Sequence, residues 1–236
     1  EILMSRTYQL SSTTIETNAA KDSDNRLYWR ANRRRLEAEG IWDSLLTASG
    51  KLNLSKIGGP SEELADGMTR RGMYGKVSRV FPNDFQVTFD FPTATISCER
   101  RYATNVPQQR LFFLNNEFVH KQAEALAERV RGAGNEEAQV KKAFAIAYQR
   151  QPTPDELAAS LELLHDQTGV TPASTSTQTA WVPSTAAASF AAKPEAAAAA
   201  VVAPSAEPQK PAKSAASPLK SLCWALLSSN EFLYLN

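Results

Sequence analysis

The sequence has few of the residues that would assign it to a functional class at once. Its only histidines, His120 and His165, lie in neither a C-x-x-C-H nor an H-E-x-x-H pattern, so attached haem and zinc-protease chemistry are not predicted. Two cysteines, Cys98 and Cys223, are too few for a disulfide scaffold. They can pair in an exported protein or lie apart as small buried side chains, and the sequence leaves both readings open.

Long apolar runs and an excess of one charge are also missing. No stretch approaches the ~20 apolar residues of a transmembrane helix. The 26 basic and 25 acidic residues give a net charge of +1, which argues against binding to nucleic acids or membrane surfaces through bulk charge. No P-loop or G-x-S-x-G motif occurs, and Ser217 to Lys220 match S-x-x-K without its companion motifs.

The first residues do not resemble a signal peptide. Glu1 to Arg6 contain no basic segment followed by an apolar run. They are typical of the last turns of an amphipathic helix, and we expect the true N-terminus to lie upstream.

The sequence does contain apolar residues at helical spacing. Hydrophobic residues make up 42% of the sequence, enough for a packed core. Apolar residues recur at steps of three and four from Leu27 to Ala48, and Gly50 is placed to end that helix. Thr153, Pro154 and Glu156 form a capping box that starts another helix. We expect further helices from Gln108 and over 117–131, 136–149 and 219–230.

Two stretches depart from this helical pattern. Residues 73–81 and 85–91 are rich in Val, Tyr, Phe and Thr and flank the turn residues Pro82 to Asp84, which predicts a small β hairpin. Residues 169–218 are dominated by Ala, Pro, Ser and Thr, a composition typical of a disordered linker. We therefore predict a mainly α protein: a helical domain with a hairpin (1–168), a linker (169–218), and a C-terminal helix that packs back on the domain (219–236).

Two groups of charged residues are candidates for chemistry. The arginines between Arg26 and Arg35 suggest an anion-binding helix, but acids at helical spacing favour a solvated, ion-paired face without nucleic-acid binding. Arg100 and Arg101 can bind a carboxylate or phosphate, or can pair internally with Asp90 to pin a loop. With Asn115, these three residues form a candidate anion or ion-pair site.

Several motifs, taken in order, resemble one family. They are Asn25-Arg26-Leu27, Arg33 to Glu39 with Asp43, Phe89-Asp90-Phe91-Pro92, Cys98-Glu99-Arg100-Arg101, Pro107-Gln108, Leu114-Asn115, Arg150 to Leu157, and Leu222 to Tyr234. Outside the linker, the chain is similar to the C-terminal part of the planctomycete-type domain of unknown function 1553. The resemblance implies an exported protein that also carries other domains, often a cytochrome c domain, and it assigns no catalytic residue.

Three hypotheses of function follow. The first is a non-catalytic structural or interaction module of an exported, cytochrome c-linked protein, whose partners are other domains of the polypeptide or a second protein. The second is part of an enzyme directed at polysaccharide, whose site needs an upstream region. The third is an anion-binding module that uses the helix from Arg26 to Arg35. No cofactor or metal is expected in this chain itself, and haem is expected only upstream.

Overall fold

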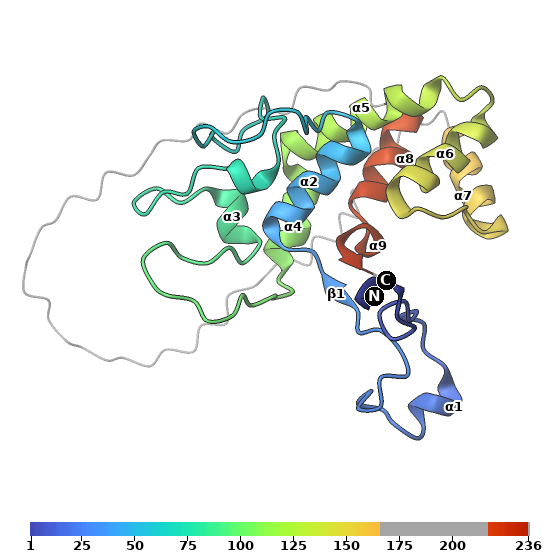
Figure 1. The fold of residues 1–236 in the computed structure, drawn as a ribbon. Helices are drawn as coiled ribbons and strands as arrows, with labels where there is room; N and C mark the ends of the chain where they lie inside the picture. The colour runs from blue at the N-terminus through green and yellow to red at the C-terminus, as the bar shows by residue number, and fades with distance from the viewer. Residues whose placement is uncertain (166–216, 236) are drawn as a thin grey trace, which may run out of the picture. The chain divides into compact units, whose positions relative to one another are not determined.

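The structure is a computed structural model that describes residues 1–165 and 217–235 (Figure 1). Nearly all of the predicted linker, residues 169–216, lies outside the described residues. The mainly helical class with one antiparallel strand pair is confirmed. The elements are η1 (Ile2–Met4), α1 (Glu16–Ala19), β1 (Arg34–Arg35), α2 (Ala38–Ser49), η2 (Gly72–Tyr74), α3 (Asp84–Thr88), α4 (Pro107–Asn115), α5 (Glu117–Arg131), α6 (Glu136–Tyr148), α7 (Pro154–His165), α8 (Pro218–Leu227), α9 (Asn230–Leu233) and β2 (Tyr234–Leu235).

Helix α5 is the central element of the core, and it packs against α2, α6 and α8. The helix begins where predicted, because the Asn116 side chain accepts a hydrogen bond from the Phe118 amide at 2.9 Å. Its inward face consists of residues at helical spacing that are fully buried: Val119, Ala123, Leu126 and Val130. This face explains why a helix with many charged residues lies in the middle of the fold.

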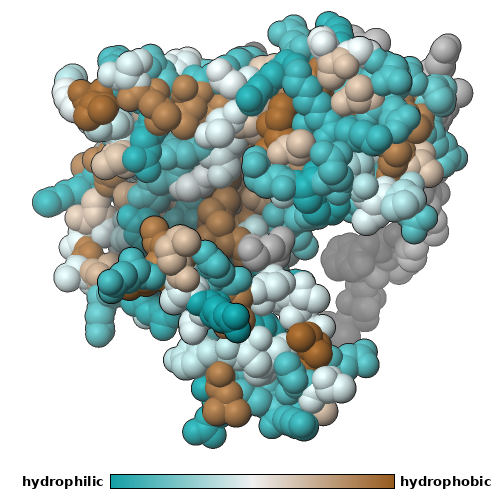
Figure 2. All heavy atoms as spheres, turned by 45° about the vertical axis from the view of Figure 1, so that its right-hand side comes forward, coloured by the Kyte–Doolittle hydropathy of each residue, from teal (hydrophilic) through white to brown (hydrophobic). Residues whose placement is uncertain are grey.

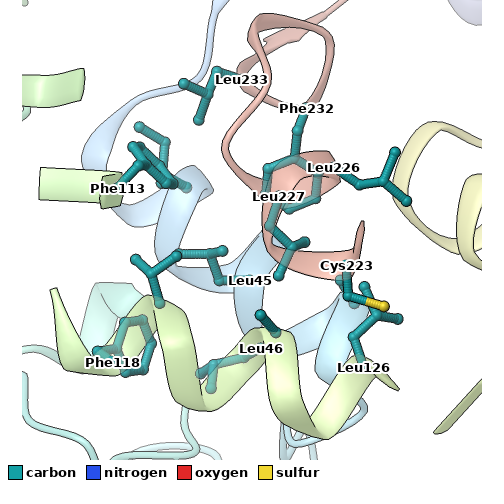
Figure 3. Packing of buried hydrophobic residues seen from close by; sticks show 14 of the residues in the cluster. Leu45, Leu46, Phe113, Phe118, Leu126, Cys223, Leu226, Leu227, Phe232 and Leu233 are labelled. Carbon is teal, nitrogen blue, oxygen red and sulfur yellow. The ribbon is translucent and has the colours of Figure 1, made fainter. Parts of the chain in front are cut away.

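Helix α8 also packs against α5. Ser217 caps it by accepting a hydrogen bond from the Lys220 amide, and Pro218 occupies its first turn. Cys223 and Leu227 are fully buried, and Figure 3 shows Cys223 beside Leu126 of α5. Because burying one large apolar side chain stabilises a fold by about 1.5–3 kcal/mol, α8 is an integral part of the core.

The expected helix over 27–48 begins only at Ala38, so the first part of that prediction was wrong. Leu27, which we placed on its apolar face, is 81% exposed. The Asn25 side chain binds the Arg30 carbonyl at 2.7 Å and its own backbone has a φ of 54°. Such side-chain hydrogen bonds to the local backbone compete with helix formation.

The amphipathic helix expected at the start of the sequence is also absent from the described structure. Residues Ile2–Met4 form only η1, a three-residue 3-10 helix, and none of its side chains is buried.

The strand pair lies elsewhere than predicted, so the hairpin over 73–91 was wrong. Asn83 caps α3 by accepting from the Phe85 amide at 3.0 Å, and Phe85 and Phe89, four residues apart, both face the core. Two of the aromatic residues that favoured a strand therefore lie on one face of a short helix, whereas Tyr74 lies in η2 and Phe81 is exposed before α3. The observed antiparallel pair joins β1 to β2, with Arg35 opposite Tyr234.

Helices α6 and α7 begin where predicted. The capping box of α7 is reciprocal: Thr153 N donates to Glu156 Oε2 at 2.7 Å, and Glu156 N donates to Thr153 Oγ1 at 3.3 Å. Asn135 caps α6 through the amide of Ala138 at 2.9 Å.

Candidate functional site

Asp90 is the best-connected residue of the predicted site. It follows α3 with a φ of 59°, a left-handed conformation that aspartate tolerates better than most residues. Its Oδ2 accepts hydrogen bonds from Arg35 Nη2 at 2.6 Å and Thr104 N at 2.8 Å. Its Oδ1 accepts from Thr104 Oγ1 at 2.7 Å. Both oxygens are thus occupied by the protein itself.

The environment of Asp90 favours its charged form. Burial alone would raise the pKa of this carboxyl, since its side chain is only 17% exposed. Hydrogen bonds from the Thr104 hydroxyl and amide, together with the Arg35 guanidinium, outweigh burial and lower the pKa of Asp90 below its ordinary value. Asp90 is therefore an ionised structural acceptor at neutral pH.

Arg35 is the partner that sequence reasoning did not assign to Asp90. Its side chain is 7% exposed, and besides Asp90 it donates to Gln109 Oε1 at 2.5 Å and to the Thr104 carbonyl. Gln109 in turn donates to the Thr88 carbonyl at 2.9 Å. These contacts join β1, the end of α3, the loop before α4, and α4 itself. We call Arg35, Asp90, Thr104 and Gln109 the Arg35 cluster.

Arg101 is also held by acids from another segment. Its Nη1 and Nη2 donate to the two carboxylate oxygens of Glu39 at 2.8 and 2.9 Å, and Nη1 also donates to Glu37 at 2.8 Å. Hydrogen bonding to Glu39 raises the pKa of Arg101. The guanidinium lies 5.2 Å from the centre of the Phe91 ring. Arg101 therefore attaches its loop to the start of α2.

Only three of the four predicted site residues come together. Asp90, Arg100 and Arg101 line one cleft of about 730 Å³, and Asn115, exposed at the end of α4, is not among its lining residues. Arg100 has no ion-pair partner among residues 1–165 and 217–235. The cleft is lined by Asn32, Arg33, Arg34, Arg35, Leu36, Glu37, Ala38, Phe89, Asp90, Phe91, Arg100, Arg101, Tyr102 and Ala103.

The arginines between Arg26 and Arg35 do not share a helix face. Arg35 pairs with Asp90, Arg34 pairs with Glu37 at 3.2 Å, and Arg30 lies over the Trp29 ring. The predicted anion-binding helix is therefore wrong, because β1 and irregular backbone replace it.

A third charged cluster has a role that sequence reasoning missed. Arg150, after α6, donates to Glu156 of α7 at 2.7 Å and to Glu231 of α9 at 2.6 Å. The hydrogen bonds that Arg150 donates to Glu156 are the main cause that lowers the pKa of Glu156 to about 2. Arg150 and Glu156 stood in one sequence motif and Glu231 in another, and only the fold brings them together.

The histidines and cysteines are placed separately. The His120 ring lies tilted against Trp224, with 5.0 Å between the ring centres, and His165 contacts Glu136 at 2.7 Å. Cys98 is exposed, whereas Cys223 is buried, and both are free thiols. Burial raises the pKa of Cys223 to about 12.

No metal site and no membrane-spanning helix is found in the part of the chain that the structure describes. There, no three His, Cys, Asp or Glu side chains are grouped as metal ligands. None of the described helices is both long and apolar enough to cross a membrane.

Comparison with known proteins gives one match. No curated protein and no solved structure is significantly similar to the chain. A family model described as PSD1, protein of unknown function (DUF1553), matches residues 1–164, from the start of the sequence to the last turn of α7. This range includes the Arg35 cluster and covers well over half of the sequence, and the chain therefore belongs to the DUF1553 family.

Proposed function

We propose that the chain is a non-catalytic structural or interaction module of a larger protein. The observation that carries this proposal is the use of the charged motif residues inside the fold. Arg35 is bound to Asp90, Arg101 to Glu39, and Arg150 to Glu156, each at 2.9 Å or less. The first two pairs connect segments far apart in the sequence, and Arg150 does so through its second partner, Glu231 of α9, as expected of residues that maintain architecture.

The same pairs make poor acid–base catalysts. A general acid or base works best when its pKa lies near the working pH. The pKa values of Asp90 and Glu156 are instead lowered, and hydrogen bonds occupy both oxygens of each carboxylate. A proton shuttle through either group would require breaking the contacts that hold the fold together.

Exposed apolar side chains on ordered loops support the interaction part of the proposal. Ile57 and Phe81 are each 82% exposed, and Figure 2 shows apolar surface in separate patches among hydrophilic residues. The loop of Ile57 is held by Arg70, which is buried and donates to the carbonyls of Gly58 and Pro60. A loop fixed in this way loses little conformational entropy when it binds a partner.

The finer parts of the proposal rest on the family resemblance. We propose that the larger protein is exported, that its other domains are the first partners of this module, and that haem, if present, is bound upstream in a cytochrome c domain. Sequencing the gene upstream tests these points, because an export signal and a C-x-x-C-H motif are both recognisable there.

An assay with a matched variant tests the absence of catalysis. The chain and its Asp90→Asn variant are compared on chromogenic esters, phosphates, sulfates and glycosides, at a temperature where circular dichroism shows both to be folded. We expect the two proteins to give the same background rate. A turnover that disappears in Asp90→Asn would contradict the proposal and support the enzyme hypothesis.

The interaction part needs a separate measurement. The remainder of the polypeptide, expressed separately, is titrated with the chain in a calorimeter. We expect a complex that the variant Ile57→Ser with Phe81→Ser weakens and that Val87→Ser, at another exposed apolar residue, leaves unchanged. If no complex forms, the proposal that the other domains of the polypeptide are the partners of this module is wrong.

A further inference from the structure

The cleft beside β1 has more positive than negative charges. Five arginines line it, Arg33, Arg34, Arg35, Arg100 and Arg101, and two acids, Glu37 and Asp90, line it with them. Glu39 lies outside the lining but binds Arg101. Five cations against three anions leave a surplus of two, whereas the whole chain carries only +1.

The surplus can be assigned to particular residues. Asp90 is paired with Arg35, Glu39 with Arg101, and Glu37 is shared between Arg101 and Arg34. Arg33 and Arg100 remain, and neither forms an ion pair within 1–165 and 217–235. Glu99, the acid next to Arg100 in sequence, lines a neighbouring hollow that Arg100 also lines, but the two side chains form no ion pair in the described residues.

These two arginines come from separate segments that the fold brings to one cleft. Arg33 precedes β1, and Arg100 lies in the loop that Arg101 attaches to α2. The Arg35 cluster and the Arg101 contacts fix both segments, so the arginines do not have to be brought together when a ligand binds. Both side chains are exposed, and it is the fixed backbone of the two segments that reduces the entropy lost on binding.

We propose that this cleft binds a small oxyanion ligand, a dicarboxylate or a phosphate, through Arg33 and Arg100. A guanidinium donates two parallel hydrogen bonds to a carboxylate or phosphate, which makes arginine the preferred side chain for these groups. The two guanidinium groups of Arg33 and Arg100 can pair with the two negative charges of such a ligand. Tyr102 and the half-buried Phe91 line the same cleft and offer apolar surface to the body of the ligand.

Titration followed by amide NMR spectra tests the site, with succinate and inorganic phosphate as separate probes. We expect saturable shifts confined to residues 32–38 and 89–103 for at least one probe, and the probe that binds identifies the oxyanion. The variant Arg33→Gln with Arg100→Gln should weaken binding about tenfold or more, because charge-assisted hydrogen bonds are lost. Its melting temperature should not change, since neither arginine forms an ion pair in the described residues.

The control is Arg26→Gln with Arg79→Gln, which removes the same charge from two exposed arginines that do not line the cleft. We expect it to change the affinity less than twofold. The proposal is overturned if neither probe gives saturable shifts, if the cleft variant binds as the wild type does, or if the control weakens binding as much as the cleft variant.

Discussion

Replacing Arg35 with methionine should destabilise the fold more than its position on a two-residue strand suggests. The substitution keeps most of the apolar volume of the side chain but removes the cation that binds Asp90 at 2.6 Å. The Asp90 carboxylate, with its side chain 17% exposed, would stay bonded to Thr104 without a counter-charge. Removing one partner of a buried pair costs about 3–5 kcal/mol. Because Asp90 retains some exposure, we expect a loss of about 2–4 kcal/mol.

Urea unfolding followed by circular dichroism measures this loss, with Asp90→Asn and the double variant completing a cycle. Asparagine tolerates the left-handed backbone of residue 90, so Asp90→Asn removes charge without straining the chain. The double variant leaves no isolated charge and should lose less than the sum of the two single changes, with a coupling of about 1–3 kcal/mol. A loss below about 0.5 kcal/mol for Arg35→Met, or strict additivity, would refute the structural role of the pair.

The same pair gives the protein an acid-sensitive contribution to stability. The pKa of Asp90 is lowered on folding, so its contribution is fully present above the unfolded-state pKa of about 3.9. It is lost as the pH falls through the lower folded-state pKa. The stability difference between the wild type and Asp90→Asn should therefore shrink as the pH is lowered from about 5 to 3. A difference independent of pH would mean that the carboxylate charge is not what stabilises the fold.

Three further predictions concern other parts of the core and surface. Leu227→Ala, at a fully buried position of α8, should lower the free energy of unfolding by about 2–5 kcal/mol in the same urea assay. A thiol reagent such as DTNB should modify one cysteine of the folded chain, the exposed Cys98, and reach Cys223 only after unfolding; two rapidly reacting thiols would contradict the burial of α8. Glu156→Gln should flatten the loss of stability between about pH 4.5 and 2, because the pKa of Glu156 is lowered to about 2 by Arg150.

The sequence by itself determined the elements whose signals are local. Helices α5 and α7 begin where predicted, capped by Asn116 and Thr153, because a cap needs only residues within one turn. The apolar repeat from Leu219 to Leu227 predicted a buried helix, since its spacing leaves one face that water disfavours. Local patterns also favoured charged residues as the candidates for a site, and three of those four line one cleft.

Only the tertiary structure decided what those charges do. A sequence shows Arg35 beside Glu37 and Glu39 and gives no sign that its partner is Asp90, 55 residues away. The β1–β2 pair places Arg35 opposite Tyr234, almost 200 residues away in the sequence. The sequence could not predict this pair either, because two-residue strands show no periodicity. The second predicted strand, 85–91, was wrong because aromatic residues suit a strand or a helix face alike, and burial of Phe85 and Phe89 in the core favours the helix α3. Long-range pairing thus gave Asp90 and Arg101, two residues of the candidate anion or ion-pair site, structural partners, and it left Arg33 and Arg100 without ion-pair partners in the described residues.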